Sequence, residues 1–256
     1  MRNRLAGKVA LVSGSTRGIG RSVAEMFSAQ GAKVAVTGRT VDRGAKVVDA
    51  IRANGGEAEF FTLDITSEDS VRDVINAVAE RFGGLTTLIN NAAPTATVAR
   101  TVKPLHQYGT DEWNDILTGT LTGNVFWASK YAWPYLVAAQ SSASIVNISS
   151  DQSILGLRGF GAYAAAKGGM NSVTRTLAAE GAANGIRCNT IVVGRVVSGR
   201  GDSGVGMTKG GLSTVGNPNQ IAATALFLAS DESSFITGEL IVADGGLAMN
   251  GDVHMA

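Results

Sequence analysis

Three residues in the second half of the chain carry the functional groups needed for proton transfer. Tyr163 and Lys167 are four residues apart in Tyr163-Ala-Ala-Ala-Lys167, and Ser150 ends an apolar run that begins at Ile145. Residues spaced by four share one face of a helix, so we expect the Lys167 ammonium near the Tyr163 phenol. A nearby cation favours the phenolate and lowers the pKa of a tyrosine from about 10. The pattern predicts an acid–base tyrosine, a lysine that tunes it, and a serine that hydrogen-bonds the oxygen being protonated.

The same spacing is also typical of an ordinary solvated stripe on a surface helix, so the surrounding elements have to decide. Hydrophobic residues make up 45% of the 256 positions and charged residues 17%, with 33 glycines, which favours one well-buried domain over residues 1–256. The net charge of +1, without a cluster of Lys and Arg, argues against a nucleic-acid partner. No stretch approaches the roughly 18 apolar residues that a membrane helix needs, so we expect a cytoplasmic protein.

The cysteine and histidine content argues against a metal centre. Cys188 is the only cysteine, which excludes an internal disulfide, and its apolar surroundings indicate a buried small side chain. The two histidines, His106 and His254, are far apart in the sequence. We therefore predict no metal site.

Short β-branched runs alternate with helical patterns along the whole chain. The expected strands are 9–12, 34–36, 58–63, 87–89, 144–148, 187–193 and 239–242. Strands separated by helices pair in parallel, so the pattern predicts an α/β fold: a Rossmann-type doubly wound sandwich whose seven-stranded parallel sheet has helices on both faces. The glycine-rich segment 194–216 is interpreted either as a surface loop or as a lid over the site.

A glycine-rich turn follows the first expected strand and leads into a helix. It reads Ser13-Gly14-Ser15-Thr16-Arg17-Gly18-Ile19-Gly20. Glycines permit a tight turn and close approach to a pyrophosphate, while the helix N-terminus presents unpaired N–H groups to the anion. The order strand, glycine turn, helix predicts a dinucleotide site, against the alternative of a purely structural turn.

The tip of the second expected strand distinguishes the two nicotinamide cofactors. An acidic residue there binds the ribose 2′-hydroxyl of NAD, whereas this chain has Thr37-Gly38-Arg39-Thr40. Arg39 offers a forked cationic donor for the 2′-phosphate of NADP, and Arg17 is a second candidate. The sequence thus favours NADP(H) over NAD, although either arginine is also compatible with an ordinary surface charge.

With these motifs in this order, the chain resembles the short-chain dehydrogenase/reductase family from end to end. The matching pieces are Gly14, Gly18 and Gly20, Asp64 in Leu63-Asp64-Ile65, Asn90-Asn91-Ala92, the set Ser150, Tyr163 and Lys167, and Asp244-Gly245-Gly246. The resemblance implies that Tyr163 protonates a carbonyl oxygen as hydride arrives and acts as the base in reverse. Ser150 orients that oxygen, and Lys167 lowers the tyrosine pKa and binds the nicotinamide ribose.

The resemblance also implies further contacts to the cofactor and substrate. Asp64 and Ile65 border the adenine, and Asn90 contacts the adenosine ribose. The full expected cofactor set is Gly14, Ser15, Thr16, Arg17, Gly18, Ile19, Gly20, Arg39, Asp64, Ile65, Asn90, Asn91, Ala92, Tyr163, Lys167, Gly194, Val196 and Ser198. The expected substrate contacts are Ser150, Gln152, Thr95 and Leu157, with Arg195 as a further candidate in the lid.

One position departs from the family pattern in a way that bears on proton transfer. Thr120 stands where the family usually has an asparagine that completes a proton relay, so we assign Thr120 to the catalytic set as a weaker substitute. Asn124 and Asn114 are alternatives, but they lie four and six residues away and reach the same place only if the helix is distorted. Val193 and Ala93 also replace the usual proline and glycine.

These patterns favour an NADPH-dependent oxidoreductase that interconverts a carbonyl and a secondary alcohol on a small to medium organic substrate. The alternative is a nucleotide-binding protein of the same fold with little or no turnover and a regulatory or scaffold role. A third hypothesis is epimerisation or dehydration on the same scaffold. By the resemblance we expect a homotetramer, with helices near 112–139 and 163–180 packing across one axis.

Overall fold

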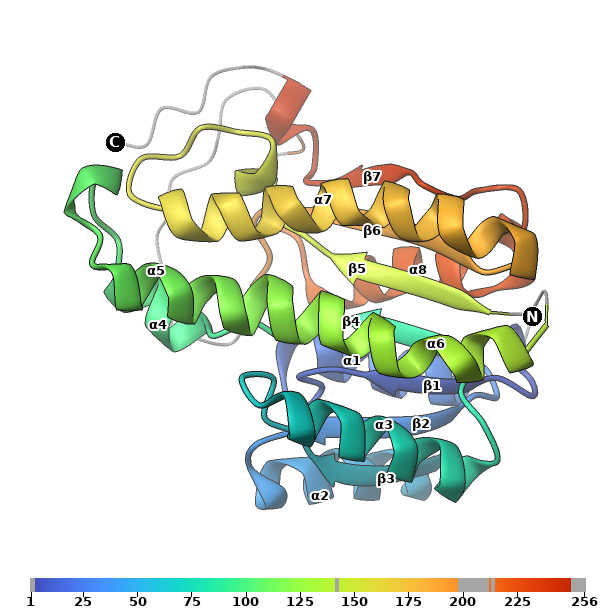
Figure 1. The fold of residues 1–256 in the computed structure, drawn as a ribbon. Coiled ribbons are helices and arrows are strands. Elements are labelled where there is room, and N and C mark those ends of the chain that lie inside the picture. Colours follow the sequence, from blue (N-terminus) through green and yellow to red (C-terminus); the bar gives the residue numbers. More distant parts are fainter. Residues whose placement is uncertain (1–2, 141–142, 198–211, 213–214, 250–256) are drawn as a thin grey trace.

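The computed structural model describes residues 3–140, 143–197, 212 and 215–249. Within them, seven strands form one parallel sheet in the order β3-β2-β1-β4-β5-β6-β7 (Figure 1). The strands are β1 Val9–Val12, β2 Lys33–Gly38, β3 Glu57–Thr62, β4 Thr87–Asn90, β5 Ser144–Ile148, β6 Arg187–Val193 and β7 Leu240–Ala243. The predicted seven-stranded doubly wound sheet is confirmed, and the strand bounds differ from the expected ones by at most two residues.

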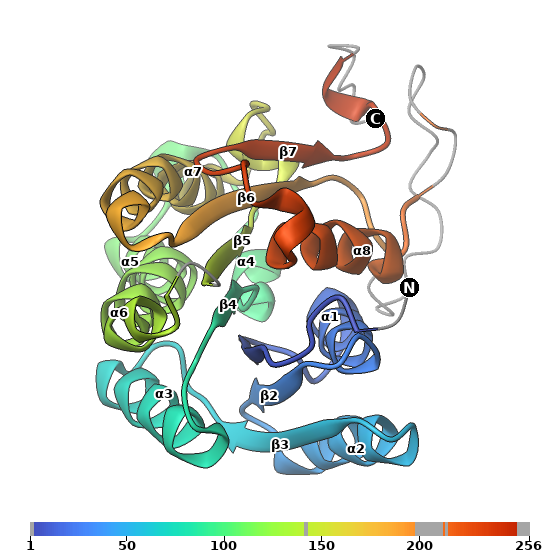
Figure 2. The ribbon, with the colours of Figure 1, turned by 90° about the vertical axis from the view of Figure 1, so that its right-hand side faces the viewer.

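Helices cover both faces of this sheet, as Figure 2 shows along the strands. One layer holds α1 Gly18–Ala29, α2 Val41–Ala53 and α8 Pro218–Ala229; the other holds α3 Glu68–Phe82, α5 Thr110–Leu117, α6 Ala128–Ala138 and α7 Gly161–Gly181. Short segments complete the described chain: α4 Thr95–Arg100, η1 Leu105–Gln107, η2 Thr118–Trp127, η3 Asp151–Ser153, η4 Ala182–Asn184, η5 Asp231–Ser233 and η6 Leu247–Met249.

The buried strands have continuous apolar sequences because both of their faces are covered. β1, Val-Ala-Leu-Val, is buried at every position: Ala10 and Val12 face the core under α1 and α8, and Val9 and Leu11 face the core under α3 and α6. Because successive side chains of a strand point to opposite faces of the sheet, this short apolar run contributes to two hydrophobic cores.

Local signals set the ends of the helices. Ser67 begins α3 by accepting a hydrogen bond from the backbone N–H of Ser70, and Gly83 ends it in the left-handed region at φ +83°. Asn217 caps α8 in the same way, and Pro218 occupies its first position. A serine at the start and a glycine at the end therefore set the bounds of α3.

The strand order places a switch point at β1, whose two neighbours β2 and β4 lead away in opposite directions. In open parallel sheets, ligands bind outside the carboxyl ends of the strands at such a point. The glycine turn follows β1 at this edge, and Ser150 follows β5 at the same edge. The topology therefore brings the two predicted sites to one side of the sheet.

Candidate active site

The glycine turn between β1 and α1 has a conformation and a packing that require glycine. Gly14 and Gly18 have φ values of +65° and +54°, in the left-handed region that favours glycine. Gly20 is limited by space: a Cβ atom there would lie 2.5 Å from both the Gly14 carbonyl oxygen and the Asn91 amide nitrogen. The turn is thus closed tightly against the end of β4, which leaves the first turn of α1 available for an anion.

Ser13, which the sequence did not single out, fastens this turn to β4. Its hydroxyl accepts hydrogen bonds from the backbone N–H groups of Asn91 and Ala92 at 2.8 and 2.9 Å. Asn91 in turn donates to the carbonyl oxygens of Ser13 and Gly14. Asn91 and Ala92, both expected near the cofactor, therefore shape the glycine turn in this structure.

Two side chains of the expected cofactor set point into the protein instead. Ser15 is fully buried; its hydroxyl donates to the Val12 carbonyl oxygen and accepts from the backbone N–H of Thr37. Ile19 packs against the core under α1. Both side chains therefore serve the fold, and a cofactor contact of Ser15 or Ile19 through the backbone stays a prediction.

The tip of β2 offers the expected positive charge. Arg39 is exposed there. The pKa of Asp64 is lowered mainly by the hydrogen bonds that its carboxylate accepts from the backbone and hydroxyl of Thr66, and the charge of Arg39 lowers it further. Thr16 lies against Gly38, where a Cβ atom would come within 2.7 Å of its methyl group. The glycine turn therefore lies beside the tip of β2, and the loop that carries Asp64, between β3 and α3, lies beside Arg39. Arg39 itself faces solvent.

Arg17 and Thr95 lie together at the surface, although the sequence assigned them to the cofactor and the substrate respectively. The Arg17 guanidinium donates to the Thr95 hydroxyl over 3.2 Å, and both residues are exposed. Thr95 is thus placed beside the glycine turn at the start of α4.

The Asn90 side chain is buried within the sheet, and the expected position of this residue beside the adenosine ribose stays a prediction. Asn90 pairs with Asn147 across β4 and β5, and its amide donates to the Asn147 carbonyl oxygen over 2.8 Å. Asn147 donates onward to Thr174 of α7 over 2.8 Å. The chain of buried amides ties the carboxyl ends of the central strands to the helix that carries Tyr163. Asn147 was not predicted, although a polar residue within an apolar strand was the available signal.

The predicted catalytic residues come from β5 and α7. Ser150 follows the end of β5, while Tyr163 and Lys167 occupy the first two turns of α7, as their spacing predicts. The Lys167 ammonium lies 5.6 Å from the centroid of the Tyr163 ring and donates to the Ile148 carbonyl oxygen over 2.6 Å. The Ser149 hydroxyl donates to the Lys167 carbonyl oxygen over 3.3 Å. β5 therefore fixes the lysine beside the tyrosine.

The ionisation of this pair differs from the sequence expectation. Burial raises the pKa of Tyr163 above its usual value, and the Asp151 carboxylate raises it further. Burial lowers the pKa of Lys167 to about 7, since only 2% of this residue is exposed. The expected lowering of the tyrosine pKa by Lys167 is absent here because desolvation outweighs it, and the ammonium is bonded to a carbonyl oxygen and not to the phenol.

Thr120 lies in a π-helical segment, η2, between α5 and α6. Such segments are rare in proteins, and those that do occur are often found at functional sites. The Thr120 hydroxyl is fully buried and has no hydrogen-bond partner among the described residues. η2 packs against α7, with Leu121 against Gly169. The helix distortion that the sequence argument required does exist, but Asn124 uses its carbonyl oxygen to accept from Ser13 over 2.6 Å and so serves the glycine turn.

The segment after β6 is described only in part. Gly194 adjoins Asp244, whose Cα atom would lie 2.6 Å from a Cβ at this position, and Val196 pairs with Gly216 in an isolated bridge. Ser198 and most of the predicted lid lie outside the described residues. Gln152 and Leu157 are half-buried beyond Ser150, and the buried carbonyl oxygen of the Gln152 side chain has no partner within the described chain.

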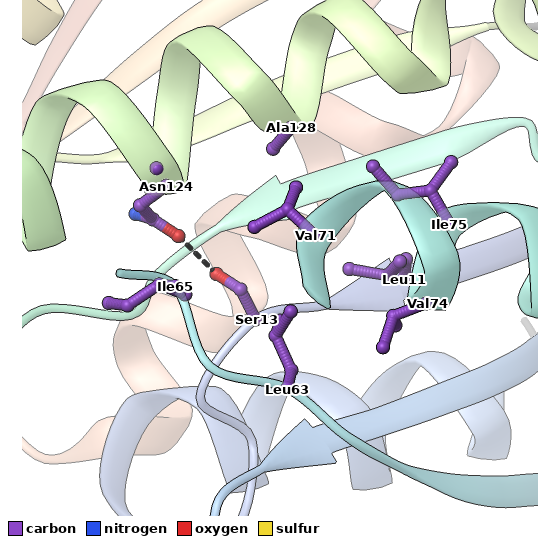
Figure 3. A pocket seen from close by; sticks show the side chains of 10 residues that line it. Leu11, Ser13, Leu63, Ile65, Val71, Val74, Ile75, Asn124 and Ala128 are labelled. Carbon is purple, nitrogen blue, oxygen red and sulfur yellow. Dashed lines mark hydrogen bonds between the residues drawn. The ribbon is translucent and has the colours of Figure 1, made fainter. Parts of the chain in front are cut away.

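A mostly apolar pocket lies between the sheet and α3, behind the glycine turn (Figure 3). Leu11 of β1 and Val71, Val74 and Ile75 of α3 line it, and the bond between Ser13 and Asn124 closes one end. None of Ser150, Tyr163 or Lys167 borders it. We assign this pocket to the packing of η2 and α3 and not to the reaction.

Two searches of the described residues bear on other functions. Among them, no three histidine, cysteine or acidic side chains gather in a way that could hold a metal ion. None of the described helices has both the length and the apolar character needed to cross a membrane.

Comparisons with known proteins agree with this architecture. The family described as enoyl-(acyl carrier protein) reductase matches residues 14–248. The chain is 37% identical to the 2,5-dichloro-2,5-cyclohexadiene-1,4-diol dehydrogenase LinX of Sphingobium indicum, over 96% of this chain and 98% of the relative. It is 35% identical to an NADP-dependent (R)-specific alcohol dehydrogenase of Lentilactobacillus kefiri, with the same two coverages.

A solved structure shows the same fold. A dehydrogenase/reductase from Sinorhizobium meliloti 1021 superposes with a TM-score of 0.84 at 26% identity, covering 95% of this chain and 96% of its own. The family match spans nearly the whole chain and the two relatives cover it almost completely. The chain therefore belongs to the short-chain dehydrogenase/reductase family.

Proposed function

We propose that this protein is an NADPH-dependent oxidoreductase that interconverts a carbonyl and a secondary alcohol on a small to medium organic substrate. The observation that carries the proposal is the placement of Ser150, Tyr163 and Lys167 at the same sheet edge as the glycine turn. A bound nicotinamide supplies or accepts the hydride. The protein then has to orient the substrate oxygen and move one proton.

Tyr163 is the proton donor in reduction. The phenol is protonated at neutral pH, as a proton donor must be, and the alkoxide-like oxygen that forms is the stronger base that takes its proton. In reduction, the carbonyl carbon gains the hydride, the oxygen gains the Tyr163 proton, and the alcohol leaves. Lys167 holds its place through Ile148, and in its charged form it favours the resulting phenolate.

Arg39 supports the choice of NADPH. It is exposed at the end of β2, where an acidic residue would oppose a 2′-phosphate, and the Asp64 carboxylate beside it is held by Thr66. The kefir relative is named as NADP-dependent. In Arg39→Ala we expect the Kd for NADPH to rise about tenfold or more, because a charge-assisted bond to phosphate is lost, and the Kd for NADH to stay within about twofold. Equal changes for both cofactors would contradict the preference.

The substrate panel follows from the relatives. LinX is named for a ring diol and the kefir enzyme for an alcohol, so the panel should contain cyclic and open-chain ketones. Wild type and Tyr163→Phe are compared by NADPH oxidation. We expect Tyr163→Phe to lose at least about a hundredfold in kcat/KM with the Kd for NADPH unchanged. Equal rates for the two proteins would refute the role of Tyr163.

The second candidate, a nucleotide-binding protein with little turnover, is favoured by Thr120 in the relay position. Its buried hydroxyl without a described partner indicates an incomplete polar network. If Thr120→Asn raises kcat by about tenfold or more, the natural chain has a weakened relay; unchanged kinetics on an active enzyme would remove the support for this candidate.

A homotetramer and a cytoplasmic location belong to the same proposal. Phe126 of η2, within the helical region 112–139 expected at one axis, is a large apolar side chain that is 56% exposed. Sedimentation at micromolar concentration tests the assembly, and a stable monomer would contradict it.

A further inference from the structure

A buried carboxylate to which the proposed reaction gives no role lies beside Ser150. Asp151 follows Ser150 directly, and only 7% of it is exposed. The Ser150 hydroxyl donates to Asp151 Oδ1 over 2.9 Å and accepts from the backbone N–H of Gln152 over 3.4 Å. A serine hydroxyl has one hydrogen to donate. While that hydrogen is bonded to an ionised Asp151, Ser150 cannot donate it to a substrate oxygen.

The short η3 segment that carries Asp151 is fastened to the helix that carries Tyr163. Asn171 of α7 donates to the Ser153 hydroxyl over 2.8 Å, and Ser153 donates to the carbonyl oxygen of Ser150. These two bonds hold Ser150 and Asp151 in a fixed position against α7. The Asp151 carboxylate is close enough to Tyr163 to raise the pKa of its phenol.

Charged groups from three other elements face Asp151. Tyr163 comes from α7, Arg195 from the segment after β6, and Asp244 from the end of β7. Burial raises the pKa of Asp151 and Asp244 adds slightly, while the bonds from Ser150 and the Gln152 backbone, and the charge of Arg195, lower it. The balance is upward, so the carboxyl becomes neutral at a higher pH than an exposed aspartate.

We propose that Asp151 is a positioning residue that sets the pH dependence of hydride transfer through Ser150 and Tyr163. Neutral Asp151 donates to the Ser150 oxygen, which frees the serine hydrogen for a substrate carbonyl. Ionised Asp151 holds that hydrogen and opposes a negative charge on Tyr163, the base that alcohol oxidation needs. The neutral form of Asp151 thus permits hydride transfer in both directions, and its ionised form slows both. This inference rests on the proposed function.

The test compares pH profiles of kcat/KM in both directions for wild type, Asp151→Asn and the control Asp49→Asn. Asp49 is exposed on α2, so its variant removes the same charge away from the site. In wild type we expect reduction to fall about tenfold as pH rises through the ionisation of Asp151, and Asp151→Asn to lack this step. In oxidation, the alkaline step of Asp151→Asn should move down by about 1 pH unit. Asp49→Asn should match wild type.

A second readout does not depend on turnover. Ultraviolet difference absorbance during an alkaline titration reports tyrosinate, and subtracting the curve of Tyr163→Phe isolates Tyr163. Its titration should move to lower pH in Asp151→Asn and stay unchanged in Asp49→Asn. An unmoved Tyr163 titration, or pH profiles of Asp151→Asn that superimpose on wild type, would overturn the proposal.

The wild-type enzyme provides a check if Asp151→Asn does not fold. A reduction profile of wild type without an acidic step would overturn the proposal by itself. Absence of turnover by wild type with every ketone would instead count against the proposed function, and the tyrosinate titration would then decide on Asp151 alone.

Discussion

Replacing Lys167 by methionine should make the protein's stability less dependent on pH. Lys167 is 2% exposed, and burial lowers its pKa from 10.5 to about 7. The folded state therefore binds fewer protons than the unfolded chain between these values, so the lysine makes stability rise with pH across this window. The part of the free energy of unfolding that is gained in this way is lost again as pH falls toward 7. Lys167→Met removes the titration and keeps a side chain of similar length.

The expected magnitude follows from the pKa difference. The full shift corresponds to on the order of 5 kcal/mol between the charged and neutral lysine, and at most about 1.4 kcal/mol of it appears for each pH unit. Between pH 7 and pH 9 the stability of wild type should thus rise by on the order of 2 to 3 kcal/mol relative to Lys167→Met. Loss of the bond to the Ile148 carbonyl oxygen adds an offset that does not vary with pH.

Urea unfolding followed by circular dichroism at pH 7, 8 and 9 measures this difference. Lys46→Met on the exposed face of α2 is the control for removing a lysine as such, and it should follow wild type at all three values. Parallel pH dependence of wild type and Lys167→Met would refute the reasoning, because it would mean that burial does not perturb this ammonium.

Two further substitutions test the local geometry. In Gly123→Ala the new Cβ would lie 1.6 Å from the Ile65 carbonyl oxygen. We therefore expect a loss of roughly 3 kcal/mol in the free energy of unfolding and weaker binding of NADPH. A free energy of unfolding equal to that of wild type would contradict the close approach. Ser67→Ala removes the cap of α3 and should cost about 1 kcal/mol in urea unfolding while leaving kcat unchanged, since α3 carries none of the proposed catalytic residues.

The fold and the placement of Tyr163 could be predicted because they depend on periodic signals. Seven apolar runs separated by helices leave few alternatives to a parallel sheet, and a spacing of four fixes two side chains on one helical face. Ser150 could be singled out because it ends the apolar run that forms β5. The family resemblance added the roles, and the topology supplied the common edge.

Side chains whose polar groups turn inward could not be identified in this way. Ser15 and Asn90 stand in motifs that suggest a ligand, yet both are fully buried and complete hydrogen bonds within the sheet. Ser13 and Asp151 were passed over although each adjoins a motif residue. The direction of a single side chain depends on neighbours distant in sequence, such as Asn124 for Ser13, and no local period encodes that.

The π-helical segment η2 links three parts of the site that are separate in the sequence. Gly123 lets η2 touch the carbonyl oxygen of Ile65 in the loop expected at the adenine. Asn124 accepts a hydrogen bond from Ser13 under the glycine turn. Leu121 packs on α7, the helix that carries Tyr163. A regular helix turns by about 100° for each residue and would move each successive side chain off these three contacts. A π-helical turn holds more residues than an α-helical one, and these three contacts explain why η2 adopts it although the usual asparagine is replaced by Thr120. Because η2 is held from both sides, a change at Thr120 is expected to act on the proton path while leaving the nucleotide turn in place.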